Sequence, residues 1–227
     1  MSHDHEHNHE HGHTHEVEHP VYTYADDSPR DVVETDHYPL MVEALRELLL
    51  EREVIQPRDL REALEKFDTV DHTVGPRAVA KAWLDADFKE QLLADGRVAI
   101  REAFQIEACE ADLVVLENTR DLHNLVVCTL CSCYPRGLMG QPPDWYKSKS
   151  YRSRAVHEPR QVMSEYGTEI PDDVTVRVHD SNADMRFMVL PLRPEGTDDW
   201  SEEQLSEIVT RDCLVGIALP ELASAGE

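Results

Sequence analysis

The sequence predicts an α+β protein, in which a helical N-terminal arm is followed by a mixed α/β layered domain that carries a cysteine-rich loop. Apolar residues recur with helical spacing up to about residue 110. Beyond residue 111 they form short runs or alternate with polar residues, as in strands. Three of the five cysteines lie within six residues, directly after one apolar run. These observations divide the chain into residues 1–37, 38–110 and 111–227.

Length and charge limit the classes of function. The 227 residues can form one large domain with an appendage or two small domains, and a hydrophobic content of 41% supports a core. We find no apolar stretch of the roughly 20 residues that span a membrane and no apolar signal region, so we expect a cytoplasmic protein. The 46 acidic and 22 basic residues give a net charge of −24, which argues against a nucleic-acid partner because phosphates would be repelled.

Residues 1–37 form a low-complexity tail and linker. Histidines alternate there with polar and acidic residues; they are His3, His5, His7, His9, His11, His13, His15 and His19. This composition cannot bury a core, so we expect disorder. Alternating imidazoles suit borderline metals such as cobalt, nickel and zinc, and we weigh a metal-capturing tail against a merely solvated one. We expect no catalytic role, because a disordered segment cannot hold a preorganised site.

Residues 38–110 are predicted to be helical. The first helix begins near Leu40, and Pro57 and Pro76 can open the second and third, because proline suits the first turn of a helix. A short fourth helix is expected at 88–93. Apolar residues recur on one face of these helices. They are Met41, Leu45, Leu48 and Leu49; Leu60, Leu64 and Phe67; and Val79, Ala80, Trp83 and Leu84. Such stripes are packing surfaces, within the chain or against a partner subunit.

Residues 111–227 mix strands and helices. Short apolar runs and one alternating segment predict the strands. They are expected at 113–116, 125–127, 174–178, 186–190 and 214–219. Ser201 and Gln204 fit a capping box, which opens a helix with an apolar face beginning at Leu205.

The three crowded cysteines, Cys128, Cys131 and Cys133, form the pattern Cys-x-x-Cys-x-Cys. Thiolates so close together suit one soft or borderline metal ion. So short a loop also brings the peptide nitrogens of Ser132 and Cys133 within reach of that ion. Three interpretations stay open. They are a structural zinc site, which normally takes four side-chain ligands; a thiol redox centre, which usually needs only Cys-x-x-Cys; and a catalytic metal held by sulfur and backbone nitrogen with one open position.

The segments around the cluster carry a resemblance. The cluster lies in the run Val127-Cys128-Thr129-Leu130-Cys131-Ser132-Cys133-Tyr134-Pro135. Further segments follow in order: Leu116-Glu117-Asn118-Thr119, Pro142-Pro143-Asp144-Trp145-Tyr146-Lys147, Tyr151-Arg152-Ser153-Arg154, Glu158-Pro159-Arg160, Arg193-Pro194-Glu195-Gly196-Thr197 and Val209-Thr210-Arg211-Asp212. Together they resemble the nitrile hydratase α-subunit family of the cobalt type, and the related γ subunit of thiocyanate hydrolase, from about residue 40 to 219.

The resemblance implies a ligand set. The thiols of Cys128, Cys131 and Cys133 and the deprotonated backbone amides of Ser132 and Cys133 would hold the metal, with the sixth position open to water or substrate. In the family, the cysteine that matches Cys131 is oxidised to a sulfinic acid and the one that matches Cys133 to a sulfenic acid. The resemblance thus implies catalytic roles for Cys131, Ser132 and Cys133, with the sulfenate oxygen of Cys133 as nucleophile or base.

The implied activity is hydration of a nitrile to an amide by the α subunit of a cobalt nitrile hydratase. Thr129 and Tyr134 match the cobalt branch, so the implied cofactor is non-corrin Co(III) rather than iron. The implied partners are a β-type subunit in one or two chains, a cobalt-delivering activator protein and a small-molecule nitrile. Two alternatives stay open: a γ-type subunit of thiocyanate hydrolase, and a non-catalytic metal-binding or cobalt-carrier protein, which the His-rich tail favours.

Arg136 and Gly137 depart from the pattern. Many nitrile hydratases have Trp-Pro-Val-Leu-Gly after the Tyr-Pro, whereas this chain has Arg136-Gly137-Leu138-Met139-Gly140. Losing the Trp and Pro opens space beside the metal and adds a cation. The segment, with Gln141, is more similar to thiocyanate hydrolase. Arg136 is therefore either a solvated or subunit-contact residue, or part of a pocket for a bulkier, polar or anionic substrate.

The remaining residues of interest are expected to have structural roles. Cys109 and Cys213 are predicted to be inert thiols, and His123 and His157 to be structural histidines. Asp180 and Asp212 are expected to anchor structure. The residues predicted to frame the loop or a subunit interface are Trp145, Tyr146, Arg152, Arg154 and Arg160.

Overall fold

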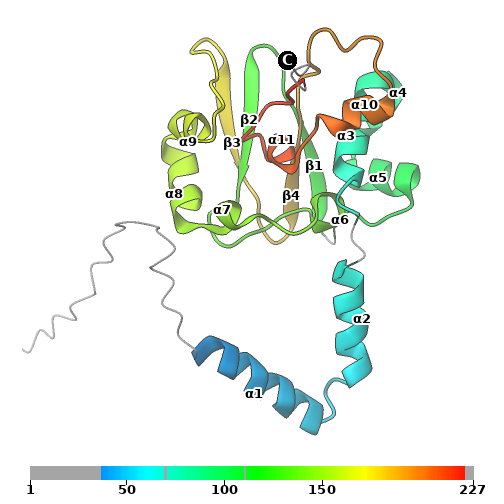
Figure 1. Ribbon diagram of the computed structural model, residues 1–227, viewed down its shortest axis with the longest axis vertical. Coiled ribbons are helices and arrows are strands. Elements are labelled where there is room, and N and C mark those ends of the chain that lie inside the picture. The colour runs from blue at the N-terminus through cyan, green and yellow to red at the C-terminus, as the bar shows by residue number, and fades with distance from the viewer. Residues whose placement is uncertain (1–36, 69–70, 110, 223–227) are drawn as a thin grey trace, which may run out of the picture. The chain divides into compact units, whose positions relative to one another are not determined.

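The computed structural model describes residues 37–68, 71–109 and 111–222, apart from the side chains of 37–39 and 65–68. Eleven helices and four strands follow one another in these residues (Figure 1). In chain order they are α1 (His37–Glu51), α2 (Pro57–Asp68), α3 (Val74–Leu84), α4 (Ala86–Ala94), α5 (Gly96–Phe104), β1 (Asp112–Glu117), β2 (Leu122–Val127), α6 (Arg136–Met139), α7 (Asp144–Lys147), α8 (Lys149–His157), α9 (Pro159–Glu165), β3 (Thr175–Asp180), β4 (Met185–Leu190), α10 (Glu202–Glu207) and α11 (Arg211–Val215).

The described residues confirm a mixed helix and strand protein. None of the helices in these ranges is long and apolar enough to cross a membrane. The His-rich tail and the side chain of Phe67 lie outside the described residues. The predicted first helix is present as α1. Five of its apolar residues are exposed, namely Leu40, Met41, Val42, Leu45 and Leu48, whereas Leu49 and Leu50 are half-buried.

The four strands form two parallel pairs. β1 pairs with β4, and β2 pairs with β3 in a register that sets Val127 opposite Asp180. The pairs meet where β2 contacts β4, so that the strands stand in the order β3, β2, β4, β1 (Figure 1). Because β2 and β3 run in the same direction, their carboxyl ends lie at one edge.

Helices cover the strands and share one core with them. α4 and α5 contact β1, α11 contacts β4, and α8 and α9 contact β2 and β3. The largest fully buried side chains come from helices and strands alike; they include Leu92, Ile100, Leu125, Leu138, Tyr146, Met188 and Leu214. Removing such apolar surface from water is the main stabilising contribution to the fold. Helices α3 to α5 pack into the same core as the strands, so the two sides of the predicted division at residue 110 share buried side chains. The division itself stays a prediction.

The predicted strand at 214–219 is wrong, because this segment begins inside helix α11 and continues as a turn. The Thr210 side chain caps the helix by accepting a hydrogen bond from the Cys213 amide, and Gly216 ends it in the left-handed region at φ +86°. Leu214 and Val215 are buried on the helix. A short apolar run can belong to a helix or to a strand, because it is too short to show either periodicity. Here the caps at both ends favour the helix.

Five short helices, α5 to α9, were not predicted from the sequence, and α3 begins at Val74, before the proline at 76. Asp95 caps α5 by accepting from the Val98 amide, and Ser148 caps α8 by accepting from the Tyr151 amide. The capping box predicted for α10 is confirmed, because Ser201 and Gln204 each bond the other's backbone amide.

Candidate metal centre

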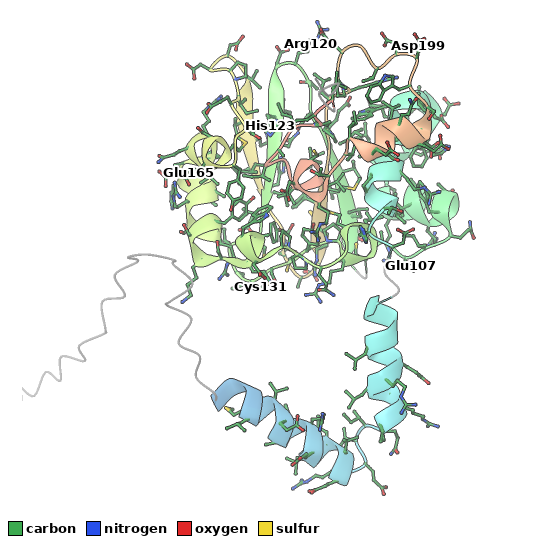
Figure 2. The ribbon with its side chains drawn as sticks, in the orientation of Figure 1. Glu107, Arg120, His123, Cys131, Glu165 and Asp199 are labelled. Carbon is green, nitrogen blue, oxygen red and sulfur yellow. The ribbon has the colours of Figure 1, made fainter. Side chains whose placement is uncertain are left out.

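The cysteine loop, residues 128–133, begins directly after β2 at the carboxyl edge of the β2–β3 pair. Ligand sites in parallel α/β sheets form at this edge, since the strand ends present loops there. Cys131 lies at this edge, whereas His123 lies towards the opposite end of β2 (Figure 2). The predicted metal loop therefore occupies the position that the topology favours.

The three thiols converge. The Sγ atoms of Cys128 and Cys131 are 3.5 Å apart, and those of Cys131 and Cys133 are 3.2 Å apart. All three lie within 4.8 Å of one another, and each thiol is free of a disulfide. Cys128 is buried, Cys133 is half-buried and Cys131 is exposed. The cluster can therefore hold one ion from the protein side and leave it open on the outer side.

Backbone amides point into the same cluster. The Cys131 amide donates to the Cys128 Sγ over 3.2 Å. A hydrogen bond from the Cys133 thiol is the main cause that lowers the pKa of Cys131, and bonds from Cys128 and the amides of Ser132 and Cys133 add to it. Burial raises the pKa of Cys133 to about 12. The predicted nitrogen and sulfur ligands are thus brought together around Cys131.

Residues distant in the chain hold the first half of the loop. Asp180, at the end of β3, accepts hydrogen bonds from the Thr129 amide (2.9 Å) and the Thr129 hydroxyl (2.6 Å). Arg152 on α8 donates to the carbonyls of Leu130 (3.0 Å) and Thr129 (3.4 Å). Asp180 thus anchors structure as predicted, and Arg152 frames the loop.

Tyr146 on α7 holds the second half of the cysteine loop, because its hydroxyl donates to the Cys133 carbonyl over 2.9 Å. The sequence placed Tyr146 near the loop or an interface and gave no sign of this bond. Tyr134 follows Cys133 and is buried, and its hydroxyl has no hydrogen-bond partner among the described residues. The two rings pack edge to face at 5.2 Å.

The other singled-out side chains lie outside the cluster. His123 is buried and is hydrogen-bonded to Asn118 and to the Gly216 carbonyl, whereas His157 is exposed. Burial raises the pKa of both remaining thiols, Cys109 and Cys213. Arg154 forms ion pairs with Glu158 and Glu165, and Arg160 donates to the carbonyls of Ile170, Pro171 and Val174. These two arginines stabilise the region around α8 and α9 and do not contact the loop.

The donor set fits a soft or borderline metal. Three sulfurs together with backbone nitrogens suit cobalt, iron or zinc and are a poor match for magnesium or calcium, which prefer oxygen. Zinc in a structural site would normally take a fourth side-chain ligand. Among the described residues, these three cysteines are the one group of three or more histidine, cysteine or acidic side chains that lie close enough together to hold an ion.

A family model described as "Nitrile hydratase, alpha chain" matches residues 36–218. This chain belongs to the nitrile hydratase alpha-chain family. The resemblance inferred from the cysteine motif is thereby confirmed. The family membership favours a metal site of this family over the structural zinc site and the thiol redox centre that the cysteine spacing alone left open.

Relatives of this chain include subunits of both thiocyanate hydrolase and nitrile hydratase. The chain is 43% identical over 205 residues to the gamma subunit of thiocyanate hydrolase from Thiobacillus thioparus, covering 84% of this chain and 83% of that protein. It is 44% identical over 178 residues to the cobalt-containing nitrile hydratase alpha subunit of Pseudonocardia thermophila, covering 78% and 87%. Sequence similarity alone therefore does not separate the two activities.

The solved structures to which this chain is similar include proteins with different metals. A thiocyanate hydrolase variant matches with a TM-score of 0.77 and 41% identity, covering 82% of this chain and 91% of that one. A variant of the Fe-type nitrile hydratase from Comamonas testosteroni Ni1 matches with a TM-score of 0.77 and 40% identity, covering 84% and 93%. A recombinant thiocyanate hydrolase with partially modified cobalt centres matches with a TM-score of 0.75 and 42% identity, covering 81% of this chain and 90% of that one. The fold is thus shared by a cobalt and an Fe-type enzyme.

Proposed function

We propose that this chain is the α subunit of a cobalt nitrile hydratase, which converts a nitrile to the amide. One observation carries the proposal: the thiols of Cys128, Cys131 and Cys133 converge at the carboxyl edge of β2, and the Cys131 amide donates a hydrogen bond into the same cluster. The relatives that are named as cobalt-containing nitrile hydratases support this activity and this metal.

The roles of the residues follow from their positions. Cys128, Cys131, Cys133 and the amides of Ser132 and Cys133 would hold non-corrin Co(III), which would supply Lewis-acid polarisation of a nitrile or of water. Cys131 is exposed and marks the side from which substrate arrives. We further propose that Cys131 is oxidised to a sulfinic acid and Cys133 to a sulfenic acid, whose oxygen would act as nucleophile or base.

The site needs a partner subunit. Leu130 is 84% exposed at the tip of the loop and Cys131 is exposed beside it, although a reactive centre of this kind works better when water is excluded. We propose that a β-type subunit, in one or two chains, covers the loop and supplies donors to the oxidised sulfurs. We also propose that an activator protein delivers the cobalt to this chain, and that the chain is cytoplasmic.

Thiocyanate hydrolysis is the second candidate, and α6 favours it. Arg136 is exposed just after the loop, where it can meet an anion. Gly137 donates its amide to the Ala108 carbonyl over 3.0 Å, and a Cβ there would lie 2.4 Å from that oxygen and 2.5 Å from the Glu107 carbonyl. The Pro that many nitrile hydratases have at this place would therefore not fit unless residues 107–108 moved.

The deciding experiment measures both products. The chain is co-expressed with its partner subunit and cobalt, and is assayed for amide from a panel of small, bulky and polar nitriles, and for ammonia and carbonyl sulfide from thiocyanate. We expect amide, with Cys133→Ala abolishing it and the distant buried Cys213→Ala retaining it. Carbonyl sulfide without amide would overturn the proposal in favour of the second candidate.

Mass spectrometry of the peptide that contains residues 128–133 tests the chemistry. We expect a gain of two oxygens on Cys131 and one on Cys133 in the cobalt-loaded complex. A chain that retains unmodified thiols, loses its cobalt when residues 1–37 are deleted and forms neither product would instead be a cobalt carrier.

A further inference from the structure

Two buried tyrosines on neighbouring helices are hydrogen-bonded to backbone carbonyls, one in the strand that precedes the cysteine loop and one at the end of the loop. The Tyr151 hydroxyl, on α8, donates to the Val126 carbonyl in β2 over 2.7 Å. The Tyr146 hydroxyl, on α7, donates to the Cys133 carbonyl over 2.9 Å. Tyr151 is 3% exposed and Tyr146 is fully buried. Both bonds lie in a medium that excludes water, where losing a partner is costly.

Packing fixes the position of the Tyr146 ring. It lies edge to face against Tyr134 at 5.2 Å and against Trp145 at 5.8 Å, and tilted against Tyr151 at 5.7 Å. A phenol hydroxyl is protonated at neutral pH, so it can donate to the Cys133 carbonyl. A rigid ring in a dense aromatic cluster holds its hydroxyl at one point.

The acceptor determines what this bond can control. The Cys133 carbonyl belongs to the peptide that links Cys133 to Tyr134, so its direction fixes the ψ angle of Cys133. With the following residue, Tyr134, held by its own burial and packing, that angle helps set where the Cα of Cys133 and its side chain point. In the structure its Sγ lies 3.2 Å from the Cys131 Sγ.

We propose that Tyr146 is a positioning residue that preorganises Cys133 for metal binding. The inference deepens the proposed function, since Cys133 is the residue to which we assign the sulfenate. Tyr146 acts through the backbone and does not touch the metal or the substrate. By contrast, Tyr151 supports a carbonyl inside β2, whose ladder with β3 already orders that residue, so its hydroxyl serves the fold and not the loop.

The test compares Tyr146→Phe with the matched control Tyr151→Phe in the full chain, loaded with cobalt together with its partner subunit. Each change removes one buried hydroxyl and keeps the ring. For Tyr146→Phe we expect a shifted sulfur-to-cobalt charge-transfer band and about 10- to 100-fold faster loss of cobalt to a chelator, the usual size for groups that orient ligands. For Tyr151→Phe we expect a lower melting temperature with the wild-type band and wild-type cobalt retention.

A second measurement separates this inference from the proposed function. In the metal-free chain, we expect Tyr146→Phe to raise the rate at which iodoacetamide modifies Cys133, relative to Cys131, because Cys133 is freed from its neighbour. This readout requires no catalysis and holds even if neither amide nor carbonyl sulfide is formed. A wild-type band, wild-type cobalt release and unchanged Cys133 modification in Tyr146→Phe would overturn the inference, as would equal effects in Tyr151→Phe.

Discussion

At the scale of single residues, the three thiols of the loop are chemically unequal before any metal binds. Cys131 is exposed and its pKa is lowered, first of all by the hydrogen bond from the Cys133 thiol. Cys133 is half-buried with a pKa raised to about 12 by burial, and Cys128 is fully buried. Since the thiolate is the reactive and metal-binding form, Cys131 is the ligand that becomes available first.

This inequality predicts an order of modification. When the metal-free chain is treated with iodoacetamide and followed by peptide mass spectrometry, Cys131 should react first and the buried Cys128 and Cys213 last. A lowered pKa means that the Cys131 thiolate forms at a lower pH than an ordinary thiol, so its reaction should persist below the pH at which Cys133 stops reacting. Modification of Cys213 as fast as Cys131 would contradict the described burial.

Asp180 supplies a second test at this scale. Asp180→Ala removes the acceptor for both the amide and the hydroxyl of Thr129, so the start of the loop should loosen. We expect about 10-fold faster loss of cobalt to a chelator, because groups that orient ligands typically contribute this much. Asp172→Ala, which removes the same charge from an exposed position outside the site, is the control and should behave as wild type. Equal cobalt retention in the two variants would disprove the anchoring role.

At the scale of elements, α6 is the part of the site where this chain departs from the motif of many nitrile hydratases. Its Gly137 lies against the carbonyls of Glu107 and Ala108, so the departure at Arg136 and Gly137 is coupled to the segment that links α5 to β1. A change of substrate preference would therefore require both segments to change together.

We predict that Gly137→Ala destabilises the chain by about 1–3 kcal/mol, the usual cost of overpacking a filled site. The reason is the 2.4 Å approach of the added Cβ to the Ala108 carbonyl oxygen. Urea unfolding of Gly137→Ala measures the loss, with the exposed neighbour Arg136→Ala as a control that should change stability by no more than about 0.5 kcal/mol. Wild-type stability of Gly137→Ala would show that residues 107–108 move freely.

The elements also show where sequence reasoning succeeds. The short apolar runs predicted β1 and β2, the alternating valines predicted β3, and two side chains predicted the capping box of α10. Each of these signals is local. The parallel pairing, the helix at 211–215 and the hydrogen bond from Tyr146 depend on partners far along the chain or on a cap at each end, and a local period carries no information about them.

The same reasoning explains the partial success at the site. The spacing of Cys128, Cys131 and Cys133 in one short loop already forces their sulfurs together, so the cluster could be predicted. Asp180 comes from 51 residues away and was expected only to anchor structure in general terms. Under the proposed function, a partner subunit covers the loop and supplies donors to it, and a single chain does not encode that contribution.

At the scale of the whole molecule, an acidic chain presents an apolar and reactive tip. The net charge is −24, yet Leu130 is 84% exposed beside the exposed thiol of Cys131. A single exposed leucine is ordinary on a protein surface, but this one lies beside a thiol that the proposed function requires to be shielded from water. This contrast supports the proposal that a partner subunit covers the loop.

We therefore expect the partner to protect Cys131. In the complex with its β-type subunit, alkylation of Cys131 should be at least about 10-fold slower than in the isolated chain, because a buried interface core excludes the reagent. Leu130→Asp should weaken the complex, since it places a charge in that core, and gel filtration would detect the loss. Equal alkylation rates in the complex and the isolated chain would show that the partner leaves the loop open.

The parallel pairing of β2 with β3 also dictates when the site can appear during folding. The loop follows β2 directly, but the Asp180 that anchors it arrives only after the intervening helices have formed and β3 has returned to its neighbour. Pairings between segments distant in the chain form slowly, since the loop between them must close first. Cobalt captured by a nascent chain would therefore meet three mobile thiols, and cobalt supplied after folding would meet a shaped site. The topology thus determines whether cobalt meets mobile thiols or a shaped site, depending on when the metal is supplied.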